Sequence, residues 1–506
     1  MKKNGFLTKR VIAFLLAAVM VLSLAACGDD NSNTPSDDGN TQADTPSTNP
    51  SSDDQNTPDD ANEPEEPAAP EYDFGGRVVR IGCYYDLTPD PEANAIEAAL
   101  AERIAFVEEN YNCKIEFLTI EGDFISEYVT SVLAGDPICD IAYARTRDVV
   151  PSLIEGGIAY PVSDLGVFDF DAYKWRQDVS TAGTYKGKTY CWLLKDPEIR
   201  YGIFWNKTLF EQYGLPDLYE LMENGEWTWD KLKEIAMAGN QDFESDGTID
   251  IYGFNARENL PWCFISSNGV NVVQQTASGL TMNLDDPAIV EALTALQDFT
   301  TTVDYKNSID WSSEGWDSMI TGFRDGKYMM CLEEYWISYG YLTKEDNPMQ
   351  DDWGWVPFPK GPSATDWSCY GKENGCRFML NGIEDPTTVA LIYDLITDLA
   401  DTDEEWDNLV EEKLEGWAND GQTVENVAYI YNNGLSSINI LEGYSSIKEV
   451  VNNMFGEVSN GSSTPQTAIE TYKSQIENAI ADAASHDYNA DMQEYVDAAA
   501  EAEAEE

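Results

Sequence analysis

The sequence predicts an α/β fold with two domains, on the basis of two observations. From residue 77 to residue 143, short apolar runs alternate with segments whose apolar residues recur at helical spacing. This alternation is typical of a mostly parallel sheet with helical crossovers. The segment between two acidic ends, from residue 71 to residue 490, is also too long for one hydrophobic core. We therefore expect two α/β units.

The first elements follow from these patterns. Residues 77–84, 113–120 and 140–143 are strand-like apolar runs, whereas residues 93–109 and 124–134 have helical spacing. In open parallel sheets, ligands bind beyond the carboxyl ends of the strands. One candidate rim of a binding site is therefore formed by Tyr84, Tyr85, Asp86, Arg145 and Arg147.

Later segments continue the alternation as far as residue 400. We expect Thr228 to cap a helix over residues 229–238, because a threonine hydroxyl can accept a hydrogen bond from the first helical turn. The other expected elements are a turn between strands at 185–190, strands at 199–206 and 328–332, and a strand followed by a helix over 377–400.

The N-terminal 27 residues resemble a bacterial lipoprotein signal. Lys2, Lys3, Lys9 and Arg10 precede an apolar run that is short for a membrane span, and small residues precede Cys27. The resemblance implies that residues 1–26 are removed and that Cys27 carries lipid such as palmitate. The alternative is that Cys27 is a free thiol after an ordinary secretory signal. The lipid would anchor the protein to the outer face of the cell membrane.

Residues 27–70 are predicted to be a disordered tether. They are rich in Asp, Asn, Ser, Thr, Pro and Glu and contain no Lys or Arg, so they cannot bury enough apolar surface to fold. Their charge and proline content keep such a segment extended. A spacer of this length indicates a thick wall to cross, hence a Gram-positive cell. At the other end, residues 491–506 are expected to be an acidic tail, with a frayed end over 497–506.

Charge excludes several functional classes. The chain has 30 Lys and Arg against 92 Asp and Glu, with a formal net charge of −62. Nucleic acids and anionic membrane surfaces both require basic side chains for binding. We therefore expect no nucleic-acid partner, and we expect a monomer. The acidic surface also argues against a strongly anionic substrate, unless Arg145, Arg147 and Arg377 cluster locally.

Cysteine and histidine usage excludes other classes. No cysteines form a C-x-x-C pair, so structural zinc and thioredoxin-like sites are not expected. Cys369 and Cys376 could form a disulfide across a glycine-containing loop. His486 is the only histidine, which argues against a Ser-His-Asp or Cys-His catalyst. We expect neither enzymatic activity nor a required cofactor.

A series of short motifs resembles the maltose-binding-like extracellular solute-binding proteins, the receptors of carbohydrate ABC importers. Trp205 stands where the family usually has tyrosine in a Tyr-Asn-Lys motif. The resemblance spans roughly residues 75–480 and is weaker after residue 400. In chain order the motifs are Gly187-Lys188, Phe204-Trp205-Asn206-Lys207, Trp227-Thr228-Trp229-Asp230, Ile251-Tyr252-Gly253-Phe254, Phe323-Arg324-Asp325-Gly326-Lys327 and Val356-Pro357-Phe358-Pro359-Lys360-Gly361.

The resemblance implies a two-lobed fold of the class II periplasmic-binding-protein type, with the ligand between lobes joined by a hinge. The chain would cross between lobes near residues 199–206 and 367–378. The expected N-terminal lobe comprises 71–200 plus 376–430, and the expected C-terminal lobe comprises 201–375 plus 431–490. The implied partners are a sugar and the permease subunits of an ABC transporter.

Candidate ligand-binding residues combine aromatic platforms with hydrogen-bonding groups, as sugars require. The chain has 14 Trp and 27 Tyr, and any one of them could equally pack in a core. In the resembling family an aromatic lies in the cleft at the position of Trp336 or Tyr335. Glu333 and Glu334 are natural acceptors for sugar hydroxyls. The further candidates are Trp262, Tyr84, Asp86, Arg145, Trp205, Tyr370 and Arg377.

An acidic loop resembles an EF-hand-type calcium site. Its acidic residues recur at alternate positions around Gly247, but Gly253 stands where the bidentate Glu would be. The alternative is an acidic turn in which Gly247 adopts a positive φ. The candidate calcium ligands are Asp242, Glu244, Asp246, Thr248 and Asp250.

The sequence leaves two other functions open. A secreted glycoside hydrolase could use two carboxylates, with Glu333 or Glu334 acting beside Asp86. A receptor for a non-sugar polar solute is the second alternative. The favoured hypothesis is a membrane-anchored extracellular receptor that binds an oligosaccharide and delivers it to an ABC permease.

Overall fold

The computed structural model describes residues 72–505, except 198, 199, 306–314, 316, 345 and 434. Ala69–Glu506 form one unit by contact density. The predicted signal peptide (1–26), the lipidated Cys27 and the tether (27–70) lie outside the described residues. Within the described ranges, no helix combines the length and the apolar character that crossing a bilayer needs.

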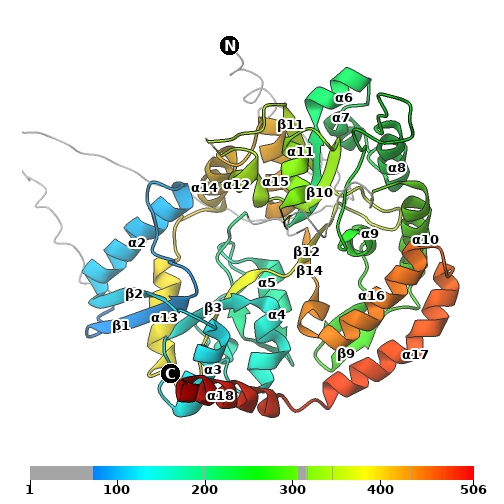
Figure 1. The fold of residues 1–506 in the computed structure, drawn as a ribbon. Helices are drawn as coiled ribbons and strands as arrows, with labels where there is room; N and C mark the ends of the chain where they lie inside the picture. Colours follow the sequence, from blue (N-terminus) through cyan, green and yellow to red (C-terminus); the bar gives the residue numbers. More distant parts are fainter. Residues whose placement is uncertain are drawn as a thin grey trace, which may run out of the picture. The chain divides into compact units, whose positions relative to one another are not determined.

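The N-terminal lobe is built on a five-stranded sheet with the strand order β2-β1-β3-β13-β6 (Figure 1). β1 (Arg77–Cys83) pairs in parallel with β2 (Cys113–Thr119) and β3 (Ile141–Arg145), as the sequence predicts. β13 (Gly375–Met379) then pairs antiparallel with both β3 and β6 (Cys191–Trp192). The sheet is therefore completed by a strand from much later in the chain.

Helices cover this sheet where the sequence predicts them. α2 (Ala95–Tyr111) begins at Asn94, whose side chain accepts from two backbone N–H groups, and α3 (Phe124–Ala134) begins at Asp123 in the same way. Gly135 ends α3 in the left-handed region. The other elements of this lobe are α4 (Thr146–Asp148), η1 (Val149–Leu153), η2 (Val162–Leu165), α5 (Gln177–Ala182), β4 (Thr184–Tyr185), β5 (Lys188–Thr189) and α13 (Pro386–Ile396).

The C-terminal lobe contains an antiparallel sheet with the order β10-β7-β11. β7 (Tyr201–Asn206) is central and buried along its whole length, between β10 (Met330–Glu334) and β11 (Trp353–Pro357). Gly202 is required here, because a Cβ at this position would lie 2.2 Å from the Trp355 ring. The indole of Trp355 therefore packs directly on the β7 backbone.

Helices and one hairpin complete this lobe. The predicted cap of α8 is confirmed, because Thr228 Oγ1 accepts from Lys231 N at 3.3 Å. The elements are α6 (Lys207–Tyr213), α7 (Leu218–Glu223), α8 (Trp229–Ala238), α9 (Leu260–Ser267), β8 (Val273–Thr276), β9 (Gly279–Met282), α10 (Pro287–Thr302), α11 (Ser318–Arg324) and α12 (Ile337–Tyr341).

Three segments lie between the two sheets, and we call them the crossing segments. The first connects β6 to β7 and includes the described residues 193–197 and 200. The second is residues 372–375, between β12 (Cys369–Lys372) and β13. The third follows β14 (Ser436–Ile438), which pairs in parallel with β12, and continues into η3 (Ile440–Gly443) (Figure 1). The two-lobed fold class predicted from the sequence is confirmed.

The predicted lobe boundaries are wrong after residue 400. α14 (Asp403–Glu415) packs on α2, but α15 (Gly421–Asn432) packs on β11 of the C-terminal lobe. Residues 403–432 therefore contact both lobes instead of belonging to the N-terminal lobe. The reason is the apolar face of α15, whose Val427 and Ile430 enter the same hydrophobic cluster as Trp353.

The expected acidic tail over 491–506 lies in a helix as far as residue 505, including the part from residue 497 that was expected to fray. α16 (Ser445–Ser459) and α17 (Pro465–Ala484) pack with α10 in the C-terminal lobe. α18 (Tyr488–Glu505) packs on α3 of the N-terminal lobe. Met492 anchors this helix: it is 2 % exposed and lies in the cluster of Leu153 and Ile154. The chain end thus contacts the lobe in which the fold begins.

The possible disulfide between Cys369 and Cys376 is not formed in this structure. All eight cysteines among the described residues are buried and free. Cys369 and Cys376 lie in different hydrophobic clusters, on either side of the second crossing segment. Each therefore packs as a small apolar side chain.

We predict that Met492→Ala destabilises the protein by about 2–5 kcal/mol, because the truncation leaves a cavity beneath α18. Urea unfolding followed by circular dichroism measures this loss. Glu494→Ala on the exposed side of the same helix is the matched control and should change the midpoint little. Equal effects of the two substitutions would contradict the docking of α18.

Candidate functional site

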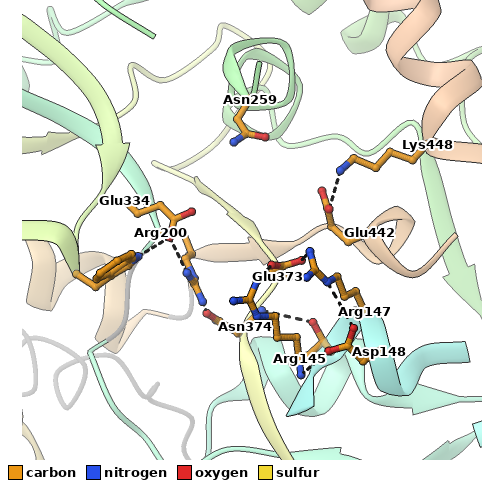
Figure 2. A network of polar contacts seen from close by, with 12 residues as sticks. Arg145, Arg147, Asp148, Arg200, Asn259, Glu334, Glu373, Asn374, Glu442 and Lys448 are labelled. Carbon is orange, nitrogen blue, oxygen red and sulfur yellow. Dashed lines mark hydrogen bonds and ion pairs between the residues drawn. The ribbon is translucent and has the colours of Figure 1, made fainter. Parts of the chain in front are cut away.

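Polar side chains from both lobes meet at the crossing segments (Figure 2). Arg145 ends β3, Arg200 ends the first crossing segment, and Glu334 ends β10. Glu373 and Asn374 occupy the second crossing segment. Arg200 Nε donates to Asn374 Oδ1 at 2.9 Å. Side chains from the two sheets are thereby connected through the hinge.

Glu373 is the centre of a buried ion cluster. Its carboxylate, 3 % exposed, accepts from Arg145 Nη1 at 2.7 Å and pairs with Arg147 Nη1 at 2.9 Å. Asp148 Oδ2 accepts from Arg145 N at 3.1 Å. A buried carboxylate is costly to desolvate, and two guanidinium partners offset that cost. The cluster fixes Arg145 and Arg147 at the rim that the sequence predicts.

Glu334 joins the C-terminal lobe to this network. It accepts from Arg200 Nη1 at 2.6 Å, from the Tyr201 hydroxyl at 2.9 Å, and from Trp336 Nε1. Burial raises the pKa of Glu334, but the charge of Arg200 and these hydrogen bonds outweigh it and hold that pKa below its ordinary value. The bond to Trp336 fixes the indole of a partly buried aromatic at the edge of the network.

Glu333 is the neighbour of Glu334 and has a different environment. Its side chain is buried and pairs with Arg257 at 3.2 Å. Burial raises the pKa of Glu333 to about 7, although the charge of Arg257 opposes the shift. The two adjacent carboxylates therefore differ in protonation near neutral pH.

A cavity of about 580 Å³ lies beside these residues in the C-terminal lobe. Trp262 lies on its wall, stacked on Tyr370 with ring centroids 6.1 Å apart, and donates from Nε1 to Asn452 Oδ1 at 3.1 Å. Such a cavity suits a ligand with both apolar and hydrogen-bonding faces. Its lining is Ala256, Arg257, Glu258, Asn259, Pro261, Trp262, Tyr305, Lys372, Lys448, Asn452, Phe455, Gly456 and Ser459.

The predicted rim of the N-terminal lobe presents aromatic side chains. Tyr84 and Tyr85 are both 42 % exposed, and both contact Tyr143. The Arg377 guanidinium lies 4.9 Å from the centre of the Tyr143 ring. Asp86 Oδ1 accepts from Thr88 N at 2.9 Å and so stabilises its own turn. Tyr84 is thus available as a platform, whereas Asp86 has a local structural role.

Three candidate ligand-binding residues pack in the core instead, and Trp262 itself is only 5 % exposed. Tyr335 is fully buried and stacks on Phe204, and Trp205 is buried against Phe210 and Tyr219. Tyr370 is also buried and supports Trp262 from behind. Tyr335 follows the end of β10 and its ring enters the hydrophobic cluster of Phe204 and Trp355. Trp205 is buried because both faces of β7 are covered.

Sequence reasoning missed several residues of the network. Arg200 bonds Asn374, and Glu373 bonds Arg145, but Arg200 and Glu373 each stand in a segment without a recognisable motif. Arg145 lies 228 positions from Glu373 along the chain, so no local spacing could reveal this pair. The remaining missed residues are Asn259, Asn374, Arg257, Lys372, Glu442 and Lys448.

The acidic loop uses its carboxylates for its own backbone. Asp242 accepts from Asp246 N at 3.2 Å and from Gly247 N at 2.9 Å. Gly247 adopts φ +90°. Across the described ranges, no three His, Cys, Asp or Glu residues are grouped so that they could hold a metal ion. Calcium binding by Asp242, Glu244, Asp246, Thr248 and Asp250 stays a prediction.

Residues 89–390 match the family of bacterial extracellular solute-binding proteins, and the chain belongs to this family. The expectation of an extracellular solute-binding protein is therefore confirmed. The family consists of binding proteins and not of enzymes. No curated protein sequence matches the chain.

Solved structures share the fold at low sequence identity. A cyclo/maltodextrin-binding protein bound to maltotetraose aligns with 80 % of this chain and 97 % of its own, at TM-score 0.55 and 16 % identity. The cyclic α-maltosyl-1,6-maltose binding protein of Arthrobacter globiformis covers 80 % and 99 %, at TM-score 0.56 and 14 % identity. The GacH receptor of Streptomyces glaucescens, studied with acarbose, covers 80 % and 99 %, at 0.51 and 16 %.

We predict a pH-dependent stability difference between the wild type and Glu333→Gln. The pKa of Glu333 rises from 4.5 to about 7 on folding, so its ionisation opposes folding as pH rises. The unfolding free energy of the wild type should fall relative to the variant between about pH 4.5 and pH 8, by about 3 kcal/mol. Denaturant titrations at several pH values measure this. Glu234→Gln, at an exposed pair on α8, is the control, and parallel pH profiles for all three proteins would refute the prediction.

Proposed function

We propose that this protein is the lipid-anchored extracellular receptor of an ABC importer and that its cargo is a carbohydrate, most simply an oligosaccharide. The proposal places the lipid on Cys27 at the membrane and the acidic tether of residues 27–70 across the wall of a Gram-positive cell. The two lobes then capture the sugar outside the cell and present it to the permease.

The observation that carries the proposal is the pairing of fixed aromatic rings with hydrogen-bonding groups at the hinge. Trp336 is held by Glu334, and Trp262 is held by Asn452 and Tyr370. Sugars present an apolar C–H face beside their hydroxyls, so rings fixed in orientation lose little entropy on binding them. The structures that share this fold include proteins complexed with maltotetraose and acarbose, which supports the same ligand class here.

The hinge supports a signalling role for ligand binding. The polar network runs from Arg145 through Glu373 and Asn374 to Arg200 and Glu334. A ligand that contacts both ends of this network would favour the closed arrangement of the lobes, because it binds that arrangement more tightly. The closed arrangement of the lobes has a shape that a permease can recognise.

The same geometry weighs against the hydrolase alternative. Retaining and inverting glycosidases need a carboxylic acid and a second carboxylate that flank the scissile bond. Asp86 is hydrogen-bonded to its own turn, and the pKa of Glu334 is held below its ordinary value, since Arg200 and its hydrogen bonds outweigh burial. Glu333 is enclosed beside Arg257. These side chains support binding better than proton transfer.

We predict that an oligosaccharide binds residues 71–506 and is recovered intact. Isothermal titration calorimetry against a panel of oligosaccharides, with chromatography of the recovered sugar, tests this. Trp336→Ala should weaken the affinity for the sugar that binds by at least about 10-fold, because it removes a stacking surface.

Phe243→Ala is the matched control for the aromatic truncation. Phe243 is 61 % exposed on the acidic loop, so its loss should leave the affinity unchanged. Cleaved sugar would identify a hydrolase. If only a non-sugar polar solute binds, the cargo belongs to that solute class and not to the carbohydrates.

We predict that Cys27→Ser releases the protein from the membrane. Without the thiol there is no acceptor for the lipid, and one acyl chain contributes about 0.8 kcal/mol per buried CH₂. Incorporation of labelled palmitate and the protein's distribution between membrane and medium measure the effect. Cys113→Ser is the control, because Cys113 is buried in the folded domain. Equal labelling of the Cys27 variant and the wild type would refute lipidation at this residue.

A further inference from the structure

Two acidic residues near the hinge, Glu373 and Glu442, are each more buried than their basic partners. The Glu373 side chain is 3 % exposed and that of its partner Arg145 is 43 % exposed. Glu442 is 4 % exposed and its partner Lys448, bonded at 2.6 Å, is 24 % exposed. A ligand approaching these pairs therefore meets the cation first.

The cavity of about 580 Å³ has the same character. Three basic residues line it, Arg257, Lys372 and Lys448, against one acidic residue, Glu258. This is a local reversal in a chain of 92 Asp and Glu against 30 Lys and Arg. The overall negative charge of the protein does not explain why the lining of this cavity is basic.

Lys372 has no acidic partner, unlike the other two basic residues that line the cavity. Arg257 pairs with Glu333 and Lys448 pairs with Glu442. In the part of the chain that the structure describes, the Lys372 ammonium makes no hydrogen bond or ion pair, and only its backbone carbonyl accepts, from Asn439 N at 2.8 Å. Lys372 also belongs to the second crossing segment, next to Glu373.

We propose that the cargo is an acidic saccharide, whose anionic group pairs with Lys372 between Arg257 and Lys448. This inference rests on the proposed function and adds the ligand's charge to it. The anionic group is either the carboxylate of a uronate or the sulfate of a sulfate ester. Both accept a charge-assisted hydrogen bond from an ammonium group.

The physical argument is the cost of an unpaired charge when the lobes close. A neutral sugar would leave the Lys372 ammonium in a site that loses water, and a buried ion without a partner is strongly disfavoured. An anionic group replaces the lost water with a charge-assisted hydrogen bond. The site should therefore bind an acidic sugar more tightly than its neutral counterpart, because the neutral sugar leaves the Lys372 ammonium without a partner.

The experiment compares matched ligands by calorimetry: uronate oligosaccharides, the same oligosaccharides as methyl esters, and sulfated oligosaccharides. The acid should bind at least 10-fold more tightly than its ester. Lys372→Met should remove that difference by weakening the acid alone, and Lys372→Arg should retain it. Lys231→Met, at an exposed pair on α8, is the control and should bind as the wild type does.

The outcomes separate the two proposals. Preference for uronates identifies a carboxylate, and preference for sulfated sugars identifies a sulfate ester. If the wild type binds a neutral oligosaccharide as tightly as the acids, the acidic cargo is overturned while the receptor function stands. If neither acidic nor neutral saccharides bind, the carbohydrate proposal itself fails. The comparison of acid with ester in the wild type does not depend on any variant folding.

Discussion

The Arg145–Glu373–Arg147 cluster is the interaction on which the arrangement of the site depends. Glu373 lies where the chain passes from one sheet to the other, Arg145 ends β3, and Arg147 follows in α4. Removing the carboxylate would release both guanidinium groups, which are 43 % and 40 % exposed, from their fixed positions and let them turn into solvent. The adjacent Asn374 then orients Arg200, and Arg200 orients Glu334. One buried carboxylate thus determines where side chains of both lobes are placed.

The two carboxylates at the end of β10 show how neighbours in sequence acquire different properties. Glu334 has three donors, which keep its pKa low although burial opposes them. Glu333 has burial as its dominant influence, and its pKa rises to about 7. Burial raises both pKa values, and only at Glu334 do the charge of Arg200 and the three hydrogen bonds outweigh it. Trp336 benefits from the ionised partner, because a charged acceptor holds its indole firmly.

Sequence reasoning succeeded where the determinants were local. The spacing of apolar residues identified β1, α2, β2, α3 and β3, and Thr228 was identified as a cap because capping involves residues three positions apart. It failed where the determinants were distant. The docking of α15 on β11 and the partners of Glu373 depend on residues far apart in the chain. Tyr335 and Trp205, two candidates for the ligand site, are buried, and the sequence did not reveal that tertiary packing covers both faces of β7 and the residue after β10.

The completion of the N-terminal lobe by late segments has a consequence for the order of folding. The sheet that begins at β1 lacks its β13 neighbour until residue 379 is available, and α3 lacks α18 until residue 505. A chain that emerges N-terminus first from a ribosome or a secretion channel therefore holds β3 with an unpaired edge for most of its synthesis or passage. Strand pairs this far apart in the chain form slowly, because the entropy of closing the loop is lost before the stabilising contacts are made. Folding of this lobe is consequently a late, post-translocational event, and its unfinished sheet is the surface that a chaperone outside the membrane would have to protect.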